Sequence, residues 1–262
     1  MLRSTVLAAL WSASTVFAAP AWPQANWGVA KTASHDTVSD YFNLLAKKVD
    51  ASKHLSQAPI CDLAKALMPT GATPPLPAPA EDLELAHVAI GRGTQNYTCD
   101  VNQPDAAPVQ IGALATLFNV SCIASIYPDL LQALPKVALQ FDLPTSGLTG
   151  RMSPATMLVS GKHYFTNTTT PFFDLNTSHQ QLGEAPCAKL NSSNAPTDAP
   201  KGPDGSLAVP WLRLGAEPGA TGGLREVYRI ETAGGSAPAT CKGMPAAFEV
   251  QYAAQYWFFR TP

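Results

Sequence analysis

Histidine and aspartate side chains that could do acid–base or metal chemistry gather between residues 162 and 179. Lys162-His163-Tyr164 is followed by Asp174 and His179. Two His and one Asp could bind a metal ion with one open position, or His163 could act as a base beside Asp174. The spacing matches no compact ligand motif, and a His in an alternating strand is more often a half-buried polar residue. We treat His163, Asp174 and His179 as candidate catalytic residues and predict no resident metal ion or other cofactor.

Carboxylates on expected strands, Glu226, Glu231 and Glu249, form a second group of candidates. Glycoside hydrolysis needs two such groups that meet in space, whatever their separation in the sequence. On an alternating sheet, however, the same residues would simply face solvent. The sequence contains neither the Gly-x-Ser-x-Gly turn of serine hydrolases nor the His-Glu-x-x-His motif of zinc proteases. A hydrolase would therefore have to use His163 with Asp174, or the strand carboxylates.

Aromatic side chains in the C-terminal half suggest ligand binding instead of catalysis. Trp211, Tyr228, Tyr256 and Trp257 could stack on sugar rings or line an apolar pocket, or they could fill the core. Because successive side chains of a strand point to opposite faces, the run Tyr256-Trp257-Phe258-Phe259 places aromatic rings on both faces of its sheet. At least one face must present them to a helix, a loop or a ligand.

Five cysteines indicate disulfide bonds, because none of them has the Cys-x-x-Cys spacing of zinc or redox sites. We predict that Cys61, Cys99, Cys122 and Cys241 form the cross-links and that Cys187, which lies in an irregular stretch, is the remaining free thiol. The sequence does not determine the connectivity; Cys99 with Cys122 is one possible pair.

The N-terminus has the features of a secretory signal peptide at residues 1–18: a basic start at Arg3, an apolar run from Val6 to Phe17, and small residues before the expected cleavage after Ala18. That run is too short to span a bilayer, which takes about 20 residues, and we expect no later membrane span. Five N-glycosylation sequons support secretion to the extracellular space. They begin at Asn96, Asn119, Asn167, Asn176 and Asn191. The net charge of −2, without charged clusters, argues against nucleic acid as a partner.

Residues 19–80 are expected to form an arm, two helices and a Pro-rich connector. Helical spacing of apolar residues predicts a helix that begins at Asp36 or Ser39 and runs to Val49, and a shorter helix at 60–68. The connector at 69–79 contains repeated prolines and could dock on the next domain or act as a spacer.

Residues 81–262 read as a β-rich domain with short strands between Gly- and Pro-rich turns. At its centre we predict a hairpin, residues 83–100, that turns at Gly91 and Gly93. One or two helices are expected at 123–140, and a glycosylated surface loop near 167–206. The other expected strands are 109–121, 155–160, 162–166, 207–214, 224–232 and 248–260. The fold class is therefore mainly β, sandwich or barrel-like, with a few short helices.

Four segments together resemble a family of secreted, mostly fungal proteins that is a domain of unknown function. They are 91–99 (Gly-Arg-Gly-Thr-Gln-Asn-Tyr-Thr-Cys), 161–165 (Gly-Lys-His-Tyr-Phe), 232–241 (Thr-Ala-Gly-Gly-Ser-Ala-Pro, then Cys241) and 252–258 (Tyr-Ala-Ala-Gln-Tyr-Trp-Phe). The resemblance implies a secreted single domain and brings no catalytic residues. Members are often labelled malate dehydrogenase, but here Asn96 follows Gly91 and Gly93 where a dinucleotide-binding turn needs a third Gly. We therefore expect no such activity.

The sequence as a whole favours a secreted, N-glycosylated, disulfide-containing protein that is not an enzyme. Its expected partner is cell-wall carbohydrate or a small apolar ligand, and its oligomeric state is not indicated. The alternatives are a secreted hydrolase and a purely structural protein. An enzyme should bring several titratable groups with shifted pKa values into one pocket, whereas a binding protein should show an exposed aromatic surface.

Overall fold

The computed structural model describes residues 31–53, 55, 57, 59–141 and 159–262. The expected signal peptide at 1–18, most of the arm expected at 19–34 and the first part of the expected strand at 155–160 lie outside these residues. Residues 31–34 of the expected arm belong to a helix instead.

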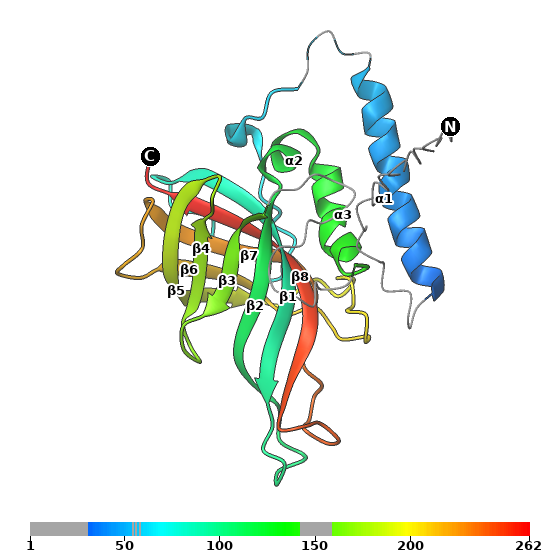
Figure 1. Cartoon of the computed structure of the whole chain (residues 1–262), viewed down its shortest axis with the longest axis vertical. Helices are drawn as coiled ribbons and strands as arrows, with labels where there is room; N and C mark the ends of the chain where they lie inside the picture. The colour runs from blue at the N-terminus through cyan, green and yellow to red at the C-terminus, as the bar shows by residue number, and fades with distance from the viewer. Residues whose placement is uncertain (1–30, 54, 56, 58, 142–158) are drawn as a thin grey trace, which may run out of the picture.

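Eight antiparallel strands form a closed barrel in which each strand pairs with its neighbours in the sequence and β8 returns to pair with β1 (Figure 1). The mainly β, barrel-like prediction is thereby confirmed. This order is that of an up-and-down barrel, which leaves no unpaired edge. The strands are β1 (Glu84–Thr98), β2 (Val109–Asn119), β3 (Val159–Phe165), β4 (Pro171–Asn176), β5 (Gln181–Ser193), β6 (Trp211–Ala216), β7 (Leu224–Gly234) and β8 (Ala247–Arg260).

The helices lie on one outer side of the barrel. They are α1 (Lys31–Ser52), the 3-10 turn η1 (Leu63–Lys65), α2 (Ser121–Ile126) and α3 (Pro128–Ala138). Figure 1 shows α3 between α1 and the barrel, and α3 contacts β1, β7 and β8. The N-terminal helix is confirmed, and the one or two helices expected at 123–140 are observed as two, α2 and α3. In place of the helix expected at 60–68, the structure has only the short η1. No helix in the described part of the chain has the length and apolarity needed to cross a bilayer.

The predicted hairpin at 83–100 is wrong, because β1 runs unbroken through both glycines. A Cβ atom on Gly93 would lie 1.9 Å from the Leu114 carbonyl oxygen of β2, and one on Gly91 would lie 2.4 Å from the Tyr256 ring. The two glycines therefore allow the close approach of a neighbouring strand and an inner ring, a common reason for glycine inside a strand.

Two further expectations are corrected between residues 155 and 206. Gly161 does not separate the strands expected at 155–160 and 162–166 but lies within β3, where an added Cβ would come 2.3 Å from the Asp174 carbonyl oxygen of β4. The surface loop expected near 167–206 contains β4 and β5.

Apolar side chains form two cores, one inside the barrel and one between its outer face and the helices. β8 contributes to both: Tyr252, Tyr256 and Phe258 belong to the inner core, and Trp257 and Phe259 to the outer core. Aromatic rings thus occupy both faces of this strand, as its sequence required, and α3 covers part of the outer one.

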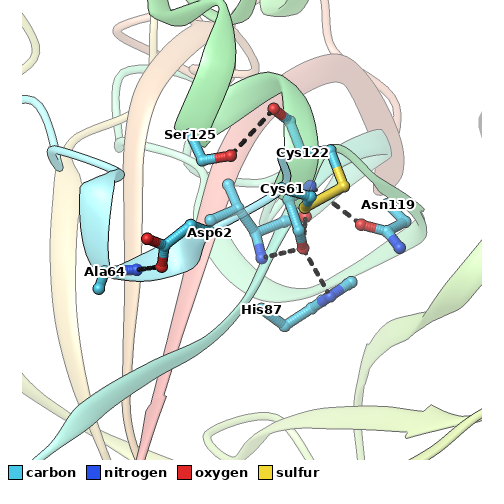
Figure 2. Close-up of a disulfide and its surroundings, with 9 residues drawn as sticks. Cys61, Asp62, Ala64, His87, Asn119, Cys122 and Ser125 are labelled. Atoms are coloured by element: carbon cyan, nitrogen blue, oxygen red, sulfur yellow. Dashed lines mark hydrogen bonds between the residues drawn. A yellow bond between two sulfur atoms is a disulfide. The ribbon is translucent and has the colours of Figure 1, made fainter. Parts of the chain in front are cut away.

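The disulfides join Cys61 to Cys122 and Cys99 to Cys241, so the pair Cys99 with Cys122 is wrong. Figure 2 shows the first bond, which fixes the chain before the barrel to α2. The partners are 61 and 142 residues apart in the sequence, so on a chain-entropy model each bond stabilises by about 4–5 kcal/mol. Cys187 is free as predicted, but it is buried in β5 and not in an irregular stretch.

We expect Gly93→Ala to lower the free energy of unfolding by about 1–3 kcal/mol or more, because the added methyl group overlaps backbone atoms of β2. Urea unfolding measures the change. Gly112→Ala is the matched control, since its Cβ would meet nothing closer than the Phe165 side chain at 3.5 Å. Equal stability of the two variants would contradict the packing described for β1.

Candidate functional site

A cavity of about 260 Å³ lies inside the barrel and reaches the surface at one end. Its apolar wall is formed by Phe165, Phe173, Leu212 and Leu214. The exposed residues Thr168, Thr169 and Lys189 lie at its mouth. His163, Arg229 and Tyr256 place polar groups deeper in the wall.

Strand pairing brings these polar groups together from distant parts of the sequence. His163 of β3 is opposite Phe173 of β4, and Arg229 of β7 is opposite both Leu212 of β6 and Tyr256 of β8. Directly paired residues of an antiparallel sheet share a face, so all five point into the barrel. An eight-stranded barrel has just enough interior for its side chains or for one small ligand. Glycine and alanine on β1 and β2 keep part of this interior open.

His163 is held as a neutral imidazole. Its Nδ1 donates a hydrogen bond to the Phe172 carbonyl oxygen at 3.0 Å, and its ring stacks on Phe173 with centroids 4.3 Å apart. The pKa of His163 is lowered to about 4, mainly by burial and to a smaller extent by the nearby charge of Arg229, while the hydrogen bond to Phe172 opposes the shift. With the proton on Nδ1, Nε2 remains a hydrogen-bond acceptor.

Arg229 carries a charge in the same cavity, and no carboxylate of the described residues pairs with it. Its side chain is only 6% exposed, and no ion pair to it is found among the described residues. Nη2 donates to the Pro210 carbonyl oxygen at 3.0 Å, and the guanidinium also interacts with the Tyr256 hydroxyl. The buried Nε has no hydrogen-bond partner in the described part of the protein.

Tyr252 and Tyr256 complete the polar group, with their hydroxyls 2.8 Å apart. Burial raises the pKa of Tyr256, and the charge of Arg229 opposes the rise. Both phenols are therefore neutral near pH 7, and neither supplies a negative charge to Arg229.

The predicted triad of His163, Asp174 and His179 is not brought together. Asp174 pairs with Lys162 and so lies on the outer face, opposite to His163, while His179 is exposed in the turn between β4 and β5. Among the residues that the structure describes, no three His, Cys, Asp or Glu side chains are placed to hold a metal ion.

The three strand carboxylates also lie outside the cavity lining. Glu226 forms an ion pair with Arg213, with Arg213 Nη2 2.5 Å from Oε1, and accepts a hydrogen bond from Tyr228. Glu231 is half-buried, which raises its pKa, and Glu249 is exposed on β8.

Of the four predicted ligand-binding aromatics, only Tyr256 lines the cavity. Trp211, Tyr228 and Trp257 are fully buried in the outer core. The Pro-rich connector covers part of this core, since the Tyr228 hydroxyl donates to the Pro77 carbonyl oxygen at 3.0 Å and Gly71 lies beside the Trp211 ring. The connector is therefore docked, and these rings form no exposed platform.

A second buried polar cluster joins His87 to two serines. Ser160 Oγ lies 2.9 Å from His87 Nε2, and Ser121 Oγ lies 3.1 Å from Nδ1. Ser121 Oγ also accepts from the Val88 backbone N–H, and all three side chains are buried. Burial lowers the pKa of His87 to about 4. These hydrogen bonds connect β1, β3 and α2 inside the protein.

Sequence reasoning missed Arg229, Phe173, Leu212 and Leu214. Arg229 has no alternating pattern to mark it, because the successive residues 226–230 of β7 are all buried. Phe173 lies in β4, which falls within the region expected to be a loop.

The closed up-and-down barrel with a partly open interior defines a class of small β-barrel proteins that are built around a central cavity. Residues 79–260, which include the whole barrel, match the family described as "Protein of unknown function (DUF3455)", and the chain belongs to this family. Neither the curated proteins nor the solved structures give a match. Membership of a family of unknown function is as expected from the sequence; its fungal distribution and the dehydrogenase label stay predictions.

We expect the protein to lose stability as the pH falls from 6.5 towards 4. His87 and His163 have an ordinary pKa of 6.5 when unfolded and about 4 when folded, so the unfolded state binds more protons in this range. Each histidine should contribute a slope of up to about 1.4 kcal/mol per pH unit. Urea unfolding at pH 7, 6 and 5 measures this slope.

His163→Gln should reduce the slope, whereas His179→Gln, which changes an exposed side chain, should not. A stability independent of pH between 6.5 and 5 would contradict the burial of both imidazoles as neutral groups.

Proposed function

We propose that this protein is a secreted binding protein that holds a small, largely apolar ligand in the barrel cavity. The observation that carries the proposal is the cavity itself, whose wall combines Phe165, Phe173, Leu212 and Leu214 with a few polar groups. An apolar pocket with a small number of fixed polar groups is typical of small-molecule sites.

The size of the cavity favours a small molecule over a cell-wall polymer. At about 30 Å³ per water in the liquid, 260 Å³ corresponds to roughly nine waters, and so to a ligand of about ten non-hydrogen atoms. The burial of Trp211, Tyr228 and Trp257 removes the aromatic surface on which a polysaccharide would stack.

The alternative of a hydrolase gains little support from the same cavity. His163 has the shifted pKa expected of an active-site group, but a value of about 4 makes it a weak base near neutral pH. Asp174, Glu226, Glu231 and Glu249 are absent from the lining, so none of these four carboxylates orients His163 or acts beside it.

Secretion is supported by the signal-peptide pattern, by five sequons and by two disulfides, which persist in oxidising compartments. Among the sequons, Asn167 is exposed in the turn between β3 and β4, whereas the other four asparagines are partly buried on or near strands. Asn167 is therefore the preferred acceptor for an N-glycan.

Neutral apolar molecules of the right size should bind in the cavity. We expect 1-octanol and benzyl alcohol to raise the Tm in a thermal-shift assay, because a ligand at 100 times its Kd stabilises by about 2.7 kcal/mol. Leu212→Trp fills the cavity and should abolish the shift, whereas Leu114→Trp, at an exposed position of β2, should not. A shift with cellohexaose alone, or no shift with any apolar probe, would overturn the proposal.

Expression in a eukaryotic host tests secretion. We expect the protein in the medium to begin at Ala19 and to carry a glycan on Asn167, as seen by peptide mass mapping. Asn167→Gln should remove the mobility shift that glycosidase treatment produces, whereas Asn176→Gln should not, because Asn176 lies on β4 with its amide bound to Gly183 and Glu184. Retention of an unglycosylated chain inside the cell would count against secretion.

A further inference from the structure

Arg229 is the strongest unsatisfied feature of the barrel interior. A buried guanidinium is costly unless opposite charge or several hydrogen bonds compensate it. Arg229 donates from Nη2 to the Pro210 carbonyl oxygen and interacts with the Tyr256 hydroxyl, but its Nε has no partner in the described part of the protein.

Other arginines of the chain show how the same group is satisfied elsewhere. Arg213 pairs with Glu226 through two of its nitrogens. Arg92, also buried, donates to the carbonyl oxygens of Ala138, Gly93 and Phe141. In contrast to these two, Arg229 has a donor, Nε, without a partner among the described residues, and it lines a cavity.

The titratable side chains that the structure places around Arg229 in the cavity supply no negative charge. His163, Tyr252 and Tyr256 are held neutral by burial, and each of them is influenced by the charge of Arg229. Lys189 at the mouth is a second positive charge on the route into the cavity. The site is thus positive inside an apolar wall.

We infer that the ligand is a small apolar carboxylic acid whose carboxylate binds the Arg229 guanidinium while its hydrocarbon part contacts Phe165, Phe173, Leu212 and Leu214. This inference rests on the proposed binding function and adds the chemical class of the ligand. A planar guanidinium with a free Nε suits a carboxylate, because it can donate two parallel hydrogen bonds. The Tyr256 hydroxyl and neutral His163 complete the polar end of the site.

The test compares octanoate with 1-octanol, which share a hydrocarbon chain and differ in charge. In isothermal titration at pH 7.5, we expect wild-type protein to bind octanoate about ten to a hundred times more tightly than 1-octanol, as charge-assisted hydrogen bonds allow. Arg229→Gln should abolish this preference by weakening the binding of octanoate. Lys189→Gln, which removes only the charge at the mouth, should keep it.

Unliganded Arg229→Gln should unfold at the same or a higher temperature than wild type, because it removes a buried charge that lacks a counter-ion. A merely structural role for Arg229 would instead lower the Tm. If Arg229→Gln does not fold, Arg229→Lys is compared with the wild type instead. Lysine retains the positive charge but lacks the planar pair of donors, so this variant should keep only part of the preference for octanoate over 1-octanol.

Equal affinity of wild type for octanoate and 1-octanol would overturn the carboxylate inference and leave the binding function standing. A preference for octanoate that survives Arg229→Gln, or tighter binding of octylamine, would also overturn the inference. Failure of both octanoate and 1-octanol to bind would overturn the inference and the binding function together.

Discussion

Antiparallel pairing between β1 and β8 closes the barrel, and both cores and the cavity depend on this closure. The pairing extends from Glu84 opposite Arg260 to Thr98 opposite Ala247. Gly91 of β1 leaves room for the Tyr256 ring of β8, and Gly93 allows the backbone of β2 to approach on the other side of β1. The exposed ion pair between Arg260 and Glu84 adds little, since such pairs contribute about 0–1 kcal/mol. Backbone pairing and the packing of small against large side chains therefore hold the first and last strands together.

In the closed barrel, the sheet has an apolar outer face, which packs against the helices, and an apolar inner face, which surrounds the cavity. The outer face is covered by α3, which receives a hydrogen bond from Arg92 at the Ala138 carbonyl oxygen and one from Gln255 at the Leu131 carbonyl oxygen. The inner face surrounds the cavity. Because the disulfides and the docked Pro-rich connector lie on the outside and at strand ends, the interior can bear polar groups without carrying the whole stability of the protein.

Several elements could be predicted from the sequence because local signals agreed with the final packing. β7 and β8 alternate or are rich in aromatic residues, Pro128 marks the first turn of α3, and the odd cysteine is free. β4 and β5 are hard to predict because they contain Asp, Asn and Ser residues, which ordinarily mark loops. Glycines such as Gly91 and Gly93 can mark either a turn or a place where a neighbouring strand or side chain comes close to the backbone. The sequence alone does not distinguish the two cases, because the neighbouring residues come from other strands.

The candidate site was harder to predict than the fold. His163 was identified as a residue of interest, but its partner was sought within the same short segment, whereas a strand turns successive side chains to opposite faces. Its neighbours in the cavity, Arg229 and Tyr256, come from β7 and β8 and lie near it only because the sheet closes into a barrel. Every strand of a barrel contributes side chains to the interior, so residues that meet there can lie far apart in the sequence.

The closing of this barrel by its first and last strands also governs how the chain can acquire its structure. Glu84 and Arg260 bond across 176 positions, so the final pairing waits until nearly all of the described chain has been synthesised. Contacts of such long range make folding slow, because a large loop must close before they form. Until then β1 presents one open edge to any other extended segment. Assembly is therefore a late event of the whole chain, and an early truncation before β8 would leave an exposed, association-prone sheet in place of a smaller barrel.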